Sequence, residues 1–235
     1  MRLRNGLATI VLSLSTVLGC EFLESKPQPQ CFNCNDAQLP KKNNKYSPES
    51  YIRGDGYKSL LIEIDSVEGV NPINEDDLRL VEQVLSRIID KPKGISHKYS
   101  DVGIHSSKKV YQIADLEALA AKYRSYGRDS LSLYVLYLDG EYYFNSIAGV
   151  ALDDGTIFIF RENVPESLDK CIFMHEAGHQ FGLVGIIPQQ RVHEDSGHHQ
   201  HDSNDLCVMF YKLTNPLNYL FDRQCLEDIA AVRKK

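Results

Sequence analysis

The distribution of hydrophobic and polar residues predicts an alternation of strands and helices after residue 57. Apolar runs of strand length lie at residues 59–65, 131–138 and 155–160. Two other segments repeat apolar residues at helical spacing: one follows Asn74, a residue suited to an N-cap, and the other covers residues 113–126. Residues 95–112 predict one or two short strands. This alternation predicts an α/β domain (equally describable as α+β) with a mixed, twisted sheet.

The second half of the chain predicts one buried helix, a long loop-rich segment and a terminal helix. The residues before position 175 are mostly apolar, as a helix buried in a core requires, and Gly182 can end that helix because glycine adopts a positive φ easily. The chain is then rich in loop-forming residues up to about residue 221. Residues 222–233 predict a terminal helix. We therefore expect a loop-rich C-terminal subdomain that ends in a helix.

The N-terminus has the pattern of an export signal. Arg2 and Arg4 precede a short apolar stretch at residues 7–18, which is too short to span a bilayer. The junction at Cys20 resembles the lipobox of bacterial lipoproteins, in which this cysteine is lipidated and becomes the new N-terminus. An ordinary signal peptide cleaved elsewhere is the alternative. We expect residues 1–19 to be a lipoprotein signal peptide, and the protein to be anchored by lipid in the bacterial cell envelope, facing the periplasm or the exterior.

Residues 20–50 are rich in Pro, Gln, Asn and Lys, and they predict a flexible tether ahead of a catalytic domain at residues 51–235. Cys31 and Cys34 lie within this tether, where a local disulfide is the simplest interpretation. If Cys20 is lipidated, five of the six cysteines remain, so at least one thiol is free or used elsewhere.

The length, composition and net charge of the chain limit the classes of partner that it can bind. The chain has 235 residues, 43% of them hydrophobic, which suits one globular domain with a core. Its net charge of −6 gives no support for nucleic acid as a partner. We expect a monomer that acts on a peptide or protein and reaches the membrane only through its lipid anchor.

The strongest candidate chemistry lies in the sequence His-Glu-Ala-Gly-His at residues 175–179. On a helix, His175 and His179 lie on one face, one turn apart, which suits two nitrogen ligands of one zinc ion. Glu176 would lie beside this metal, where a carboxylate can take a proton from an activated water and pass it on.

A catalytic zinc needs a third protein ligand and an open position. Four histidines follow the motif, at positions 193, 198, 199 and 201. His193 is nearest in sequence to Gly182, and it precedes two acidic residues typical of a solvated loop. With those acidic neighbours, the histidines that do not bind this zinc could hold a second, weak metal.

The sequence resembles the metzincin clan of zinc metalloproteases, and within it the archaemetzincin-like members and a related set of bacterial lipoprotein metalloproteases. The resemblance rests on the motif at residues 175–182 and on His201, Cys207 and Met209, which keep the spacing of those members. Residues 183–200 would be an insertion. The clan's usual third histidine position is Gly185 here, and Asp202 replaces the usual cysteine after the histidine.

This resemblance implies a metzincin-like zincin fold and further roles. His201 becomes the expected third ligand, with His193 as the alternative, and Met209 the methionine of a turn beneath the metal. Tyr211 would support the transition state. The resemblance also implies a disulfide between Cys207 and Cys225, with Cys171 as a rival partner for it.

The sequence as a whole predicts a zinc-dependent endopeptidase tethered to a membrane, with Glu176 as general base. The clan resemblance implies that the strand at residues 156–160 borders the cleft and pairs with an extended substrate. The competing hypothesis is a non-catalytic surface lipoprotein that binds zinc for capture or adhesion.

Overall fold

The computed structural model describes residues 46–100, 103–106, 108–124, 131–143, 147–152, 155–185 and 193–234. The predicted signal peptide, Cys20 and the tether up to residue 45 lie outside the described residues, as do Cys31 and Cys34. Residues 186–192 of the expected insertion also lie outside them. In the described part of the chain, no helix has both the length and the apolar character that crossing a bilayer would need.

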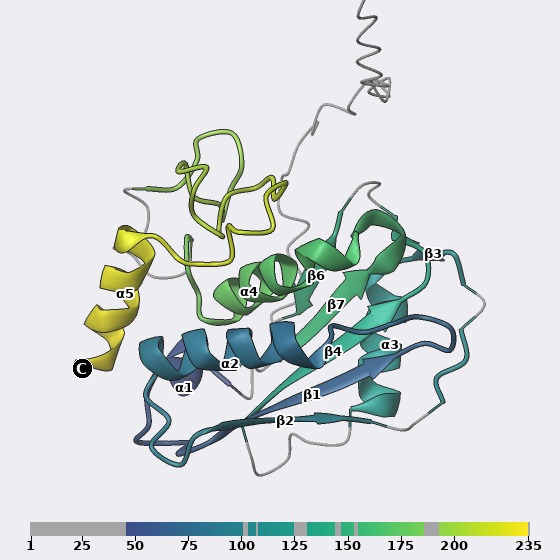
Figure 1. Ribbon diagram of the computed structural model, residues 1–235, viewed down its shortest axis with the longest axis horizontal. Coiled ribbons are helices and arrows are strands. Elements are labelled where there is room, and N and C mark those ends of the chain that lie inside the picture. The colour runs from purple at the N-terminus through teal and green to yellow at the C-terminus, as the bar shows by residue number, and fades with distance from the viewer. Residues whose placement is uncertain are drawn as a thin grey trace, which may run out of the picture. The chain divides into compact units, whose positions relative to one another are not determined.

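A five-stranded sheet forms the centre of the domain (Figure 1). In spatial order its strands are β2 (Ile95–Tyr99), β1 (Leu60–Ser66), β4 (Ser132–Leu138), β7 (Thr156–Phe160) and β6 (Gly149–Leu152). The first four run parallel, and β6 runs antiparallel to β7 with Ala151 opposite Ile157. A separate pair of short parallel strands joins β3 (Val110–Tyr111) to β5 (Glu141–Tyr142).

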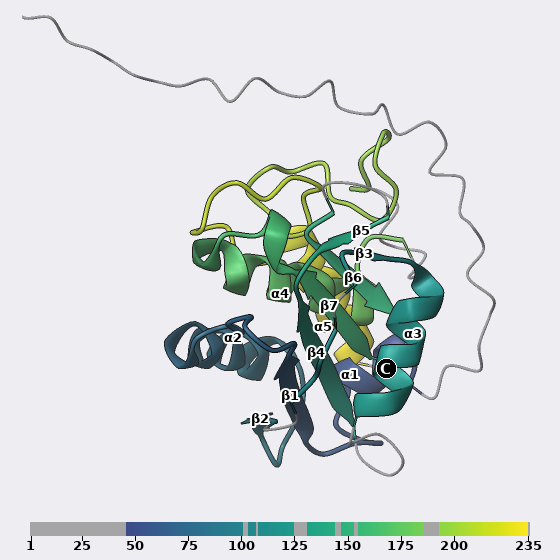
Figure 2. The same ribbon diagram turned by 90° about the vertical axis from the view of Figure 1, so that its right-hand side faces the viewer.

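Helices cover both faces of the sheet, which Figure 2 shows nearly edge-on, with α2 and α4 on one side and α3 on the other. The helices and 3₁₀ turns are α1 (Pro48–Ile52), α2 (Glu75–Ile88), α3 (Ile113–Tyr123), η1 (Arg161–Asn163), η2 (Glu166–Leu168), α4 (Asp169–Gln180) and α5 (Arg223–Arg233). The larger core lies between the sheet and α1, α2, α4 and α5, and the smaller core lies beneath α3. The structure thus confirms the predicted mixed α/β class and the terminal helix.

The start of α2 shows how local sequence sets these boundaries. The side-chain oxygen of Asn74 accepts a hydrogen bond from the backbone N–H of Asp77 at 2.9 Å, as predicted for an N-cap. Leu78, Val81 and Leu85 recur at helical spacing and are fully buried against the sheet.

The folded domain begins earlier than the predicted boundary at residue 51. Tyr46, Tyr51 and Ile52 are buried in the larger core. The buried ammonium group of Lys91 donates hydrogen bonds to the backbone oxygens of Ser50, Arg53 and Tyr57, which fixes α1 to the domain. The last residues of the expected tether therefore belong to the folded part.

The prediction that the strand at residues 156–160 pairs with an extended substrate is wrong. β7 lies between β4 and β6, and all five of its residues are buried. Both of its edges are already paired, so an added peptide strand cannot join it. The outer strand on this side of the sheet is β6, which the hydrophobic pattern did not predict.

Candidate metal centre

Helix α4 carries the central motif and is buried on nearly all sides, because it lies between the sheet and the C-terminal subdomain. The C-terminal end of α4 is formed by Gly182, as predicted. Gly182 has a φ of 71°, and the N–H of Leu183 donates to the carbonyl oxygen of Gly178 at 3.0 Å, the bond that closes a glycine-terminated helix. The helix therefore ends at Gln180, the residue after the second histidine of the motif.

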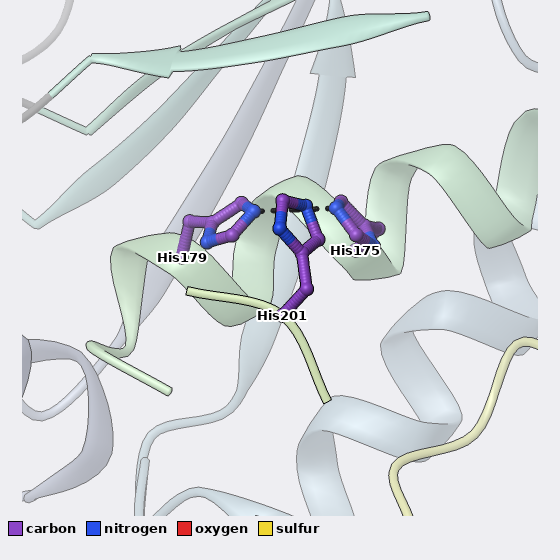
Figure 3. A group of neighbouring side chains, drawn as sticks. All are labelled: His175, His179 and His201. Carbon is purple, nitrogen blue, oxygen red and sulfur yellow. Dashed lines mark hydrogen bonds between the residues drawn. The ribbon is translucent and has the colours of Figure 1, made fainter. Parts of the chain in front are cut away.

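The structure brings His175, His179 and His201 together, with one ring nitrogen of each within 4.8 Å of the others. Figure 3 shows the first two projecting from α4 and the third reaching them from the following loop. The Nε2 atoms of His175 and His179 lie 3.2 Å apart, and the ring of His201 lies 5.1 Å and 5.3 Å from theirs, centroid to centroid.

Hydrogen bonds orient two of these rings. The Nδ1–H of His175 donates to the carbonyl oxygen of Val208 at 2.7 Å, and the Nδ1–H of His201 donates to that of His199 at 2.8 Å. Each bond leaves Nε2 unprotonated and turned toward the other histidines, as a metal ligand requires. Burial lowers the pKa of His175 to about 3, and it also lowers the pKa values of His179 and His201, so all three rings are neutral near pH 7.

This donor set fits zinc. Two ligands of a tetrahedral zinc ion, each at about 2.0–2.1 Å, are roughly 3.3 Å apart, close to the separation of the two Nε2 atoms. Three neutral imidazoles with one coordination position left over are the ligand pattern of catalytic zinc sites.

Glu176 lies beside this group and is buried against the edge strand. A Cβ atom added at Gly149 of β6 would come within 2.5 Å of the Glu176 Oε1 atom, so the strand approaches the carboxyl group only because residue 149 is a glycine. Burial raises the pKa of Glu176 to about 8, while a hydrogen bond from the backbone of Ala151 works in the opposite direction. Glu176 is thus a carboxyl group that can gain and lose a proton near neutral pH.

Gln180, which the sequence analysis did not single out, joins α4 to the same strand. Its side-chain amide donates to the carbonyl oxygens of Leu152 at 2.5 Å and of Thr156 at 3.4 Å. These two carbonyls lie at the adjoining ends of β6 and β7. Gln180 therefore fixes the edge strand at a set distance from the histidines.

Met209 is fully buried beneath α4, where its sulfur faces Gly178. A Cβ atom at residue 178 would lie 2.2 Å from the Met209 Sδ atom and 3.0 Å from a ring carbon of Phe221. The glycine between the two histidines of the motif is therefore the place where the methionine packs against the helix.

Gly178→Ala is expected to lower the free energy of unfolding by about 1–3 kcal/mol, because the added methyl group has no free volume beside two buried side chains. Urea denaturation of the metal-free protein measures this change. Gly56→Ala is the matched control, since nothing lies within 4 Å of a Cβ atom there. Equal stability of the two variants would show that Met209 moves aside without cost.

His193 does not belong to the histidine group, although it was the alternative third ligand. It is only 5% exposed, and both of its ring nitrogens face carboxylates: Nδ1 lies 3.0 Å from Asp202 and Nε2 lies 3.0 Å from Asp228. Burial lowers its pKa, but the bonds to Asp228 and Asp202 outweigh that effect and raise it. Its expected environment, a solvated loop, is therefore wrong.

The remaining histidines lie on the outer part of the loop. His198 is 3.0 Å from Asp195, and its ring stacks on that of Tyr211 at 3.6 Å between centroids. His199 is exposed and lies 3.3 Å from Glu194. The ring of Tyr211 is thus held by His198, and a role for it in catalysis stays a prediction.

A second group of ligand-type side chains lies behind the first, formed by Asp202, Cys207, Asp222 and Cys225. Hydrogen bonds already engage its carboxylates: Asp202 accepts from the thiol of Cys225, and Asp222 caps α5 by accepting from the N–H of Cys225 at 3.0 Å. The group therefore acts as a junction between the histidine loop and α5.

The predicted disulfide partners meet in this junction as free thiols. The sulfur atoms of Cys207 and Cys225 lie 3.8 Å apart, against about 2.05 Å in a disulfide. Cys171, the rival partner, lies elsewhere and donates to the carbonyl oxygen of Asn215. The pairing of Cys207 with Cys225 stays a prediction, with the two residues already adjacent.

Comparison of the folded chain with solved structures identifies its architecture. Archaemetzincin from Methanopyrus kandleri superposes with a TM-score of 0.50 over 76% of this chain and 97% of its own, at 18% sequence identity. The chain has an archaemetzincin-like zincin fold. Metalloproteinase-II from Bacteroides fragilis also matches with a TM-score of 0.50, over 78% of this chain and 56% of its own, at 15% identity. No family model and no curated protein matches the sequence.

This fold confirms the archaemetzincin-like fold that was expected from the motif at residues 175–182 and from the spacing of His201, Cys207 and Met209. The sequence did not reveal Gln180, Gly149 or Asp228, because each acts through a partner distant in the chain. Of these three residues, only Gln180 could have been found from the sequence. The helical period places this polar residue on a buried face of the motif helix, and a buried polar side chain needs a hydrogen-bond partner.

Proposed function

We propose that the protein is a zinc-dependent endopeptidase. The proposal is supported chiefly by one observation: one ring nitrogen of each of three histidines lies within 4.8 Å of the others, with the carboxyl group of Glu176 beside them and an outer sheet strand alongside. His175, His179 and His201 would hold the ion. Two known metalloproteases share the fold, which agrees with this assignment.

In this mechanism, zinc supplies Lewis-acid chemistry, which makes a water more acidic and polarises the carbonyl group of the scissile bond. Glu176 acts as the general base that accepts the water proton through its carboxylate and delivers it to the leaving nitrogen. Glu176 would start each cycle with its carboxyl group ionised, because a bound cation nearby would favour the charged form. The hydrogen bonds from His175 to Val208 and from His201 to His199 keep the ligand rings in place.

The substrate is an extended peptide that adds to β6 as another strand. Among the described strands, β6 is the last on this side of the sheet, and residues 149–152 run next to Glu176. Main-chain hydrogen bonds would give affinity that does not depend on sequence, and side-chain pockets would give selectivity. We propose that the protein acts as a monomer and needs no nucleic acid.

A peptide-library cleavage assay tests the function. Cleavage within peptides is expected with zinc present, loss of cleavage after chelation, and recovery when zinc is added back. A zinc-loaded protein that cleaves no peptide in a diverse library would favour the alternative, a zinc-binding surface protein without catalysis. Release of single terminal residues would make it an exopeptidase.

We also propose that Cys20 is lipidated and anchors the protein to a bacterial membrane. Several acyl chains on one cysteine bind firmly, because each buried CH₂ contributes about 0.8 kcal/mol. Cys20→Ala is therefore expected to move the protein from the membrane fraction to the soluble fraction. Mass spectrometry of the parent protein is the control, and a parent without attached lipid would contradict the anchor.

A further inference from the structure

The buried side chain of His193 connects the loop that carries His201 to the C-terminal helix. Asp202, which follows His201 directly, is fully buried, and Asp228 lies on α5. The imidazole lies between these two carboxylates, 3.0 Å from an oxygen of each. A carboxylate accepts hydrogen bonds, so both ring nitrogens act as donors and neither is free to bind a metal.

Backbone hydrogen bonds make the loop around His201 a compact unit. The N–H of Ser203 donates to the carbonyl oxygen of His193 at 3.0 Å, and the N–H of Asp195 donates to that of His201 at 2.7 Å. The N–H of Asp202 donates to the carbonyl oxygen of Met209 at 2.9 Å. The backbone on both sides of the third histidine is therefore fixed to residues 193–195 and to the buried methionine.

The contact of Met209 with Gly178 and the bond from His175 to Val208 hold one side of this unit against α4, which supplies the other two histidines. The side of the unit that carries His193 needs a separate link to the rest of the domain. The bond from His193 to Asp228 provides that link, because α5 packs in the larger core through Ile229 and Val232. Asp202 adds a second link, since it accepts from the thiol of Cys225 on the same helix. Small errors in ligand placement strongly weaken metal binding, so such a link has a direct effect on the site.

We infer that His193 is a positioning residue, which together with Asp202 and Asp228 fixes the loop of the third zinc ligand onto α5. The inference rests on the proposed zinc site. It gives α5 a role in metal binding, although no residue of that helix belongs to the histidine group. It also explains why a buried histidine close to the site in sequence is not one of its ligands.

Asp228→Ala is the most direct test, because this residue contacts the loop only through His193 in the interactions described and lies outside the histidine group. We expect zinc to bind about 10–100-fold more weakly, as measured by competition with a chromogenic chelator at fixed pH and at a temperature where the metal-free protein is folded. Asp228→Asn keeps an acceptor oxygen for His193 and should restore most of the affinity. Glu227→Ala, which removes an exposed neighbour paired with Arg223, is the matched control and should bind zinc normally.

Two further measurements separate positioning from general stabilisation. The rise in Tm caused by zinc should be smaller in Asp228→Ala than in the control, whatever the Tm of the metal-free protein. His193→Ala combined with Asp228→Ala should weaken zinc binding no more than His193→Ala alone, since both changes break the same link. The d–d spectrum of the Co²⁺-loaded variants should report a distorted site.

Zinc affinity and a zinc-induced Tm rise equal to those of the parent in Asp228→Ala would overturn the inference, while leaving the proposed function intact. Additive effects in the double variant would also overturn it, because the two residues would then act separately. A parent protein that retains no zinc would refute the proposed function itself, and the inference with it.

Discussion

Glu176→Gln is expected to lower kcat/KM for the best library peptide by about 10²–10⁴-fold while the zinc content stays near one ion per chain. The side-chain amide has nearly the same size and still fits against Gly149, but it cannot accept the proton of the attacking water. Because the carboxyl group is outside the three-histidine group, the metal should be unaffected. The measurement pairs steady-state kinetics with elemental analysis of the purified variant.

The control for this substitution is Glu162→Gln, which makes the same chemical change at an exposed glutamate after β7. It should leave both activity and zinc content unchanged. If Glu176→Gln loses zinc together with activity, Glu176 holds the metal or the fold, and its role as general base is wrong. Full activity in the variant would mean that another group transfers the proton.

His201→Ala is expected to cost more zinc affinity than any other change outside α4, because it removes one of three ligands and leaves an incomplete site. His193→Ala should cost only about 10–100-fold, since His193 contacts carboxylates and not the metal. Zinc titrations of the two variants compare them directly. Both must be done at one pH, because the ligand histidines bind zinc only when neutral.

Equal losses in the two variants would mean either that both residues contact the metal or that the loop folds as one unit, which the removal of either residue unfolds. Circular dichroism of the metal-free variants distinguishes that outcome from a loss of ligation. A larger loss in His193→Ala would reverse the assignment of the third ligand. His193 would then have to break its hydrogen bonds to Asp202 and Asp228 when metal binds.

The larger elements of the fold could be predicted because their signals are local. β1, β4 and α2 have long apolar patterns, and α2 also has an N-cap residue at its start. β6 was missed because its four residues, Gly-Val-Ala-Leu, do not alternate between apolar and polar and include only one strong strand former, Val150. The lack of alternation also misled the choice of cleft strand. After Thr156 every residue of β7 is apolar, because the strand is buried on both faces, which is typical of an interior strand.

The site was predictable to the extent that its residues keep fixed spacings. The positions of His175, Glu176 and His179 follow from one helical turn, and His201 was chosen through its spacing to Met209. The surroundings of His193 could not be predicted in this way. Two acidic neighbours suggested a solvated loop, but its partners are Asp202 and Asp228, and the second lies on a different element.

The link between the histidine loop and α5 also bears on when a newly made chain can first hold metal. Asp228 is synthesised after all three histidines, so a chain that has just exposed His201 at the ribosome still lacks the helix to which its loop is fixed. If the N-terminus directs export, as the proposed lipid anchor requires, and the chain folds only after export, the ligands would converge only on the far side of the membrane. The cell interior would then never contain the protein in a state able to cut peptides, without any separate inhibitor.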